Sequence, residues 1–245
     1  MQLPTALMEL LKYQLTAGRR TPQLATGVLH GLATERRTCL ASQALESMQA
    51  GHVRTNVILC STLISTVGKA GQWQFALVLL ASMANLGIKP DVISCSAGIS
   101  ACEKVAHWQL ALALLGSMTD LQPEPNVISC SAAISACAKS AKWQLALALP
   151  SSMARVQIEP NVVSCNAAIS ACGKAAQWRL AVALLDFMAR LRLQPNIISC
   201  SAAISACEKA TQWRPALALF SSIANLQIEL NVVSCNAAIS ACEKA

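Results

Sequence analysis

The 245-residue sequence has few aromatic and few charged side chains. Phe, Trp and Tyr make up 4% of it, and Asp, Glu, Lys and Arg make up 13%. So few charges exclude a polybasic tail, although the formal net charge of +7 favours an anionic partner. Ala, Leu, Ser and Cys dominate instead, and small residues in such quantity suit helices that pack closely together.

Long hydrophobic runs are also missing. The longest stretch without a charge, residues 70–88, still contains Gln72, Gln74, Asn85 and two glycines. A membrane-spanning helix needs about 20 predominantly apolar residues. We therefore expect no membrane partner.

The cysteines lack the spacing of a metal site. None of the twelve forms a CxxC pair, and the three histidines have no regular relation to them. Ten cysteines lie seven apart in pairs such as Cys95 and Cys102, roughly 10 Å apart along a helix, which is too far for a disulfide. We interpret them as small buried hydrophobic residues in a reducing compartment, with a redox or metal site as the alternative.

No catalytic centre is recognisable either. The HxE and CxxC elements of a nucleic-acid deaminase are missing, for example. The sequence therefore predicts a protein that is not an enzyme, with no catalytic residue, no metal, no cofactor and no small-molecule substrate.

What the sequence does contain is a repeat of 35 residues. Five tryptophans keep this step: Trp73, Trp108, Trp143, Trp178 and Trp213. Six lysines keep it as well: Lys69, Lys104, Lys139, Lys174, Lys209 and Lys244. A period of 20–50 residues is typical of stacked supersecondary units, so we expect one continuous all-α solenoid of helix-turn-helix repeats.

The units follow one another without linkers. Five are clear: 57–91, 92–126, 127–161, 162–196 and 197–231. Residues 22–56 resemble a degenerate unit, residues 1–21 a degenerate half-unit or a leader, and residues 232–245 a truncated unit, as expected of a fragment or a truncated gene model.

The central unit, 127–161, predicts two helices. In the first, 129–139, Cys130, Ile134 and Cys137 form one apolar stripe at helical spacing. The second, 143–154, follows a break at residues 140–141 and carries Pro150, which we expect to kink it.

A second arc of the first helix is different in character. Stacking the units turns it into an aliphatic column, a column of Ser or Asn and a column of lysine, and the residue that closes each unit is always Asp or Asn. Ser and Asn offer different hydrogen-bond patterns, a repeated cation suits a phosphate backbone, and repeated aliphatic residues can flank bases. Helix capping and a solvated face are the alternative explanation of the same pattern.

The repeat resembles the pentatricopeptide repeat family. The resemblance rests on the 35-residue length, the opening V-[VI]-S-C-[SN], the A-C-x-K before a short turn, the A-L-x-L-x-x-x-M of the second helix and the closing P-[ND]. It covers 57–245 well and 22–56 poorly, and cysteine stands where large aromatic residues are more common in the family. The tetratricopeptide family, with a period of 34 and a different tryptophan motif, fits less well.

The resemblance implies a right-handed superhelix that binds single-stranded RNA, one base per unit. It implies that bases stack on Ile58, Ile93, Ile128, Val163 and Ile198, and that phosphates lie near Lys69, Lys104, Lys139, Lys174 and Lys209. The implied pairs that select bases are Ser61/Asp91 for G, Ser96/Asn126 and Ser131/Asn161 for A, Asn166/Asn196 for C or U, and Ser201/Asn231 for A.

With the amino end toward the 5′ end, these pairs imply the core sequence 5′-GAAYA-3′. The resemblance also implies a chloroplast or mitochondrial adaptor in RNA processing, stability or translation. A helical scaffold that binds protein partners is the alternative, but such a groove should vary more than the Ser/Asn column does.

Overall fold

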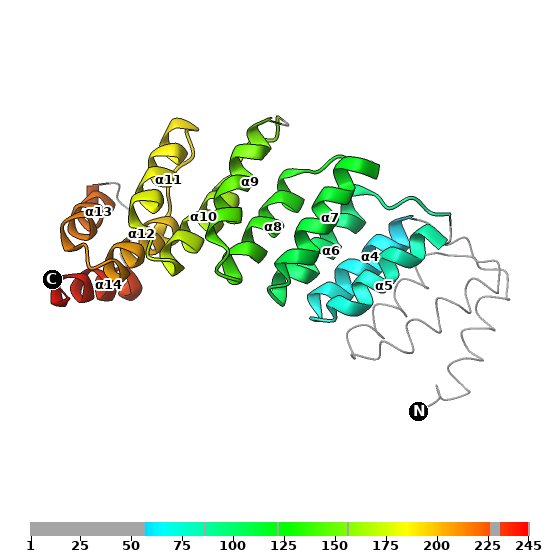
Figure 1. Ribbon diagram of the computed structural model, residues 1–245, viewed down its shortest axis with the longest axis horizontal. Helices are drawn as coiled ribbons and strands as arrows, with labels where there is room; N and C mark the ends of the chain where they lie inside the picture. The colour runs from blue at the N-terminus through cyan, green and yellow to red at the C-terminus, as the bar shows by residue number, and fades with distance from the viewer. Residues whose placement is uncertain (1–56, 86, 122, 156, 226–230, 245) are drawn as a thin grey trace, which may run out of the picture.

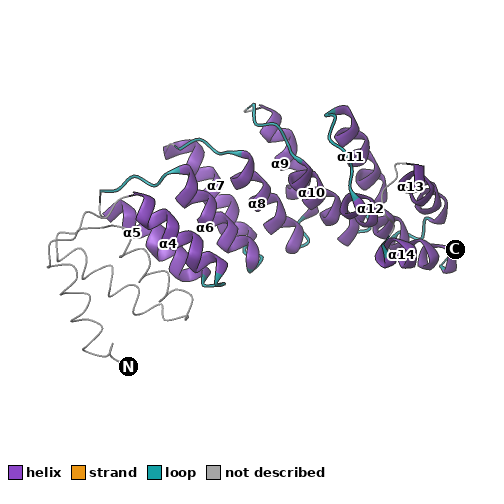
Figure 2. Cartoon of the chain, turned by 180° about the vertical axis from the view of Figure 1, so that it is seen from behind, coloured by secondary structure: helices purple, strands orange, loops and turns teal. Residues whose placement is uncertain are grey.

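A computed structural model describes residues 57–85, 87–121, 123–155, 157–225 and 231–244 (Figure 1). The expectations for residues 1–21 and 22–56 fall outside this range. Within it, every regular element is an α-helix (Figure 2). The helices are α4 (Val57–Lys69), α5 (Trp73–Asn85), α6 (Val92–Lys104), α7 (Trp108–Leu121), α8 (Val127–Lys139), α9 (Trp143–Arg155), α10 (Val162–Lys174), α11 (Trp178–Arg190), α12 (Ile197–Lys209), α13 (Trp213–Asn225) and α14 (Val232–Glu243).

The first helix of a unit begins where the last residue of the preceding unit caps it. Asn126 has an extended backbone, and its side-chain oxygen accepts hydrogen bonds from the backbone N–H groups of Ile128 and Ser129. The Ser129 hydroxyl completes a capping box by accepting from the Asn126 N–H. Helix α8 therefore starts at Val127, two residues before the predicted start, because Asn126 rather than Ser129 is the N-cap.

The first helix ends in a tight turn with a left-handed residue. After Lys139, Ala141 has φ +56°, and the N–H of Lys142 donates to the Cys137 carbonyl at 2.9 Å, as in a Schellman motif. Gly71, Ala106, Ala176 and Thr211 occupy the same place with positive φ. The turn is so short that the second helix folds back against the first.

The helices form two layers that run along the solenoid (Figure 1). Each first helix packs against the first helices before and after it, and each second helix packs between its own first helix and the next one. Small side chains permit the close approach, since a Cβ on Gly173 of α10 would lie 2.8 Å from the Ala202 carbonyl oxygen of α12. This is the superhelical repeat architecture that the sequence predicts.

The core repeats with the sequence. Ile99, Ile134, Ile169 and Ile204 of the first helices are completely buried, as are Met83 and Met188 of the second helices. Each fully buried aliphatic side chain of this size contributes about 1.5–3 kcal/mol. Because the same contact recurs in each unit, stability accumulates along the chain instead of resting on one central core.

The predicted apolar stripe of Cys130, Ile134 and Cys137 is buried. Nine cysteines of the described residues are buried: Cys60, Cys95, Cys102, Cys130, Cys137, Cys165, Cys172, Cys200 and Cys207. Burial raises the pKa of each of these thiols. For Cys137, Cys172 and Cys207 the pKa rises to about 11. These thiols therefore stay neutral at pH 7. On α14, Cys235 is half-buried and Cys242 exposed.

Pro150 lies inside α9, which continues to Arg155, one residue beyond the predicted end. The proline side chain is buried in the place where Leu115 is buried in α7.

The turn residue Thr211 should be a weak point. Its φ is +54°, which is costly for a β-branched residue and free of cost for glycine. We expect Thr211→Gly to raise the free energy of unfolding by about 1 kcal/mol, measured by urea denaturation followed by circular dichroism. The matched control, Ala183→Gly at an exposed position within α11, should lower it by about 1 kcal/mol. Destabilisation by both substitutions would contradict the strain at Thr211.

Candidate functional site

The five aliphatic residues predicted to stack on bases occupy the second position of successive first helices. Their side chains are 59–73% exposed: Ile58, Ile93, Ile128, Val163 and Ile198. Isolated exposed aliphatic residues are ordinary, but a regular column of them along one edge of a solenoid is a surface suited to planar apolar ligands.

The polar column is not a solvated face, because successive first helices pack over it. Ser61, Ser96, Ser131 and Ser201 are only 3–8% exposed, and Asn166 is half-buried. The sequence suggested solvation as one explanation of these serines, and that explanation is wrong. Their side chains lie at the junction between two units.

At that junction, the polar column meets the residues that close the units. The Ser61 hydroxyl donates to Asp91 Oδ1 at 3.0 Å, and Asn166 Nδ2 donates to Asn196 Oδ1 at 3.1 Å. The distance from Oγ to Oδ1 is 3.4 Å for Ser131 and Asn161 and for Ser201 and Asn231, and the Ser131 hydroxyl is closer to the Val127 carbonyl, at 2.6 Å. The structure thus brings together residues that are 30 apart in the sequence and that were predicted to act as pairs.

Helix capping fixes the orientation of each closing side chain. Asn161 Oδ1 accepts from the backbone N–H of Ser164 at 2.8 Å, so its amide nitrogen points away from the helix end. Asn126, Asn196 and Asn231 cap α8, α12 and α14 in the same way. Helix capping and contact with a ligand are therefore compatible roles for these asparagines. Capping uses the side-chain oxygen and leaves the two N–H donors of the amide.

Asp91 differs in one respect, since its second carboxylate oxygen can only accept. Burial opposes its ionisation, but hydrogen bonds from Ser94 and Ser61 outweigh burial and hold the pKa of Asp91 below its ordinary value. The carboxylate is thus ionised at neutral pH. Unit 57–91 presents an acceptor where the other four clear units present a donor.

A cavity of about 260 Å³ unites the predicted residues of one unit. It lies between Ile93 and Ile128, with Ser96 and Asn126 among its lining residues, and it extends to two lysines and to small residues of α4 and α6: Lys69, Lys104, Ser65, Gly68, Ala97, Ser100 and Ala101. The aliphatic, polar and cationic columns therefore converge on one hollow.

Two buried polar atoms in this column have no hydrogen-bond partner. They are Ser96 Oγ and Asn166 Oδ1, and within the described part of the chain no other buried side-chain oxygen or nitrogen is unpaired. Leaving such an atom unpaired costs about 1–3 kcal/mol. Buried polar atoms are nearly always paired in proteins, so two exceptions in one column single out this surface as a candidate site.

The lysines reach back to the preceding unit. Lys104 Nζ donates to the Lys69 carbonyl and Lys174 Nζ to the Ala138 carbonyl, both at 2.9 Å. Lys139 instead forms an ion pair with Glu103 at 3.0 Å, and Lys244 forms one with Glu208 at 2.9 Å. Sequence reasoning did not identify these two glutamates, although each precedes its lysine by 36 residues and so falls one unit earlier.

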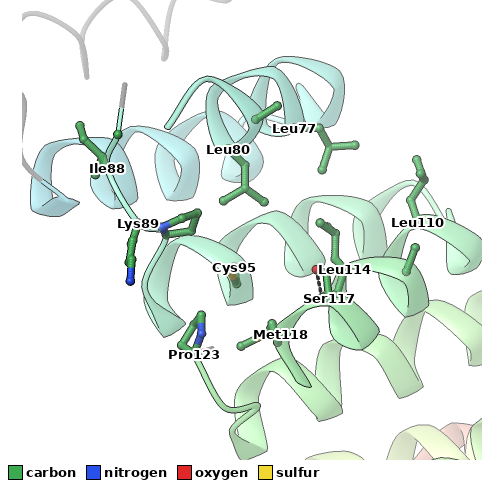
Figure 3. A pocket seen from close by; sticks show the side chains of 14 residues that line it. Leu77, Leu80, Ile88, Lys89, Cys95, Leu110, Leu114, Ser117, Met118 and Pro123 are labelled. Carbon is green, nitrogen blue, oxygen red and sulfur yellow. Dashed lines mark hydrogen bonds between the residues drawn. The ribbon is translucent and has the colours of Figure 1, made fainter. Parts of the chain in front are cut away.

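A larger apolar cavity of about 760 Å³ lies in the other layer, between α5 and α7 (Figure 3). Leu77 and Leu80 of α5 face Leu110 and Leu114 of α7 across it. It contains none of the residues predicted to contact a ligand.

Among the described residues, no helix has the length and apolarity required to cross a bilayer. Within the same residues, no three His, Cys, Asp or Glu side chains gather as a metal site would require.

Sequence models of two repeat families match the chain. The PPR repeat family matches residues 160–209, and the pentatricopeptide repeat domain matches residues 78–140 and 113–175. Together these matches cover more than half of the sequence. The chain belongs to the pentatricopeptide repeat family. No curated protein sequence matches it.

Solved structures share the fold. Pentatricopeptide repeat protein PPR10 from maize is 18% identical, with 98% of this chain aligned to 39% of that one and a TM-score of 0.62. PPR10 in complex with an 18-nt psaJ RNA element is 20% identical over 96% of this chain and 38% of that one, with a TM-score of 0.64.

The PPR domain of Arabidopsis thaliana protein-only RNase P 1, in complex with tRNA, is 11% identical over 77% of this chain and all of that domain, with a TM-score of 0.67. The chain thus spans about two fifths of the length of PPR10.

The low pKa of Asp91 gives a test of its hydrogen bonds with Ser94 and Ser61. Its stabilising effect should be present above its ordinary pKa of about 3.8 and should be lost as pH falls through the lower value of the folded state. Asparagine caps helices equally well but does not ionise. We therefore expect the melting temperature of the Asp91→Asn variant to fall less between pH 6 and pH 3 than that of the natural chain. Glu124→Gln, at an exposed position, is the control and should not differ from the natural chain in this respect. Identical losses in Asp91→Asn and the natural chain would contradict the assignment.

Proposed function

We propose that the chain binds single-stranded RNA, with one base held at each junction between units. The observation that carries the proposal is the cavity of about 260 Å³ in which the aliphatic, polar and cationic columns meet. The proposal is also supported by two proteins of similar fold, PPR10 and the RNase P domain, whose structures were solved in complex with RNA. Units 57–91 to 197–231 would accept the core sequence 5′-GAAYA-3′.

Stacking would be supplied by the aliphatic column. A base entering the cavity of unit 92–126 would have Ile93 on one face and Ile128 on the other. Bases have apolar faces whatever their identity, so this contact gives affinity with little selectivity. Selectivity must then come from polar atoms at the edge of the base.

The orientation imposed by capping explains how the pairs would choose. The carboxylate of Asp91 offers an acceptor, which suits the N–H groups of guanine. Asn126, Asn161 and Asn231 offer amide donors, which suit the unprotonated ring nitrogen of adenine. In unit 127–161 the Ser131 hydroxyl lies 2.6 Å from the Val127 carbonyl, so its proton lies there and its oxygen is left to accept from the adenine amino group.

The pair Asn166/Asn196 favours cytosine over uracil. Asn196 Oδ1 caps α12 and accepts from Asn166 Nδ2, so Asn196 presents a donor and Asn166 presents its unpaired Oδ1. Cytosine carries an amino donor beside a ring acceptor, which complements this arrangement. Uracil carries the opposite pattern. The proposed core therefore becomes 5′-GAACA-3′.

The lysine column would lie near the phosphates, at Lys69, Lys104, Lys139, Lys174 and Lys209. Lys104 and Lys174 each spend one N–H on a carbonyl and keep two for an anion.

The biological role that fits is that of an RNA-binding adaptor in a chloroplast or mitochondrion, acting in RNA processing, stability or translation. The family resemblance supports this role, and we propose that this chain acts by binding and not by catalysis. Protein partners are the second candidate, because the apolar cavity between α5 and α7 suits a hydrophobic anchor (Figure 3).

Direct binding tests the proposal. Affinities of the purified chain for short RNAs containing GAACA, GAAUA or a permuted core would be measured by fluorescence anisotropy at two salt concentrations. We expect the order GAACA, GAAUA, permuted core, with all three weakened by salt. Equal affinity for all three RNAs would exclude base selection, and absence of binding would favour a protein scaffold.

Exchange of one polar residue should change one base. Ser131→Asn recreates the Asn166/Asn196 pair in unit 127–161, so the third base should shift from A toward C. The reciprocal Asn166→Ser should shift the fourth base from C toward A while the third remains A. Both shifts would be measured as affinity ratios within a set of RNAs that vary at these two positions. Unchanged ratios would show that the polar column does not contact the base.

A further inference from the structure

The lysine column carries the same residue in every unit, but its electrostatic surroundings are uneven. We propose that RNA phosphates are held chiefly at Lys174, and that Glu103 cancels the contribution of Lys139. This inference rests on the proposed RNA binding and assigns unequal weight to lysines that the sequence makes look equivalent.

Lys139 has an acidic partner at the point where a phosphate would approach. Its ammonium group lies 3.0 Å from Glu103 Oε1, and the two side chains are 44% and 26% exposed. An ion pair this exposed adds at most about 1 kcal/mol to stability. Glu103 also lies well within a Debye length of about 8 Å, so salt at physiological concentration leaves its charge opposing that of Lys139. A phosphate that approaches Lys139 therefore meets both charges.

Lys174 has no acidic partner among the residues that the structure describes. One unit earlier, the place of Glu103 is taken by Ala138, and Lys174 Nζ donates to the carbonyl of that residue at 2.9 Å. Its other two N–H groups make no hydrogen bond to a described residue. Lys174 is thus a partly ordered cation with donors to spare, which is what a phosphate requires.

The residue just before a lysine is a second place for an acidic neighbour, since Glu103 precedes Lys104 and Glu208 precedes Lys209. Gly173 precedes Lys174, and a Cβ there would lie 2.8 Å from the Ala202 carbonyl oxygen. Glutamate therefore cannot occupy this position without displacing α12 from α10.

Neighbouring cations make Lys174 receptive to an anion. Burial and the ammonium groups of Lys139 and Lys209 lower the pKa of Lys174. A phosphate would relieve this repulsion. Toward the carboxyl end, Glu208 pairs with Lys244, and the charge of Lys209 also helps to lower the pKa of Glu208. Lys209 therefore has an acidic neighbour that Lys174 lacks.

Salt dependence of RNA binding separates the two lysines. For single strands, each phosphate contact contributes about 0.7 to the slope of log K against log salt. With an RNA containing GAACA, Lys174→Met should reduce the slope by about 0.7, and Lys139→Met by less than half of that. Lys174→Arg keeps the charge and should keep the slope, and circular dichroism would verify the fold of each variant.

Glu103→Gln tests whether Glu103 cancels the charge of Lys139. It should increase the slope by up to about 0.7, and in that background Lys139→Met should cost as much as Lys174→Met costs in the natural chain. Equal losses from the two lysine variants in the natural chain, or no effect of Glu103→Gln, would overturn the inference while RNA binding stands. Absence of salt-dependent binding to any single-stranded RNA would overturn the proposed function and this inference together.

Discussion

The hydrogen bond from the backbone N–H of Ser164 to Asn161 Oδ1 is the contact on which the rest of the unit depends. It starts α10 at the correct residue, because an extended N-cap satisfies an N–H that the helix cannot. It also joins two units, since Asn161 closes one and caps the next. Finally, it directs the amide nitrogen away from the helix end, while Oδ1 lies 3.4 Å from the Ser131 hydroxyl of α8, the first helix of the preceding unit.

This double use restricts which residues can stand at the position. Replacing an N-cap Asn or Asp by alanine costs about 1 kcal/mol, so the closing position is confined to good capping residues. Within that set, Asn presents donors and Asp presents acceptors. On the proposed function, recognition would therefore vary from unit to unit, as between Asp91 and Asn126, without loss of the helix start. The unpaired atoms of Ser96 and Asn166 are a local cost that the repeated core offsets.

The sequence predicts the fold well because the contacts of each unit recur at a fixed step. Ile134 and Cys137 could be placed in the core from helical spacing alone, and both are buried. Features that depend on a neighbouring unit were harder to predict. Burial of Ser131 comes from the packing of α8 against α10, and the pairing of Lys139 with Glu103 spans 36 residues. The residues of the candidate site could thus be named from the sequence, but their partners and the orientation of their side chains required the structure.

The balance of charge bears on selectivity. Attraction between lysines and phosphates is independent of base sequence, so every such contact strengthens binding to wrong RNAs as much as to the right one. Only 13% of the residues are charged, and two of the lysines form ion pairs with glutamates. Both features limit the attraction that is independent of base sequence. On the proposed function, discrimination among bases would then depend on the polar atoms of Ser96, Asn166 and the capping residues. On the proposed function, Glu103 and Glu208 serve specificity by weakening the part of binding that every RNA shares.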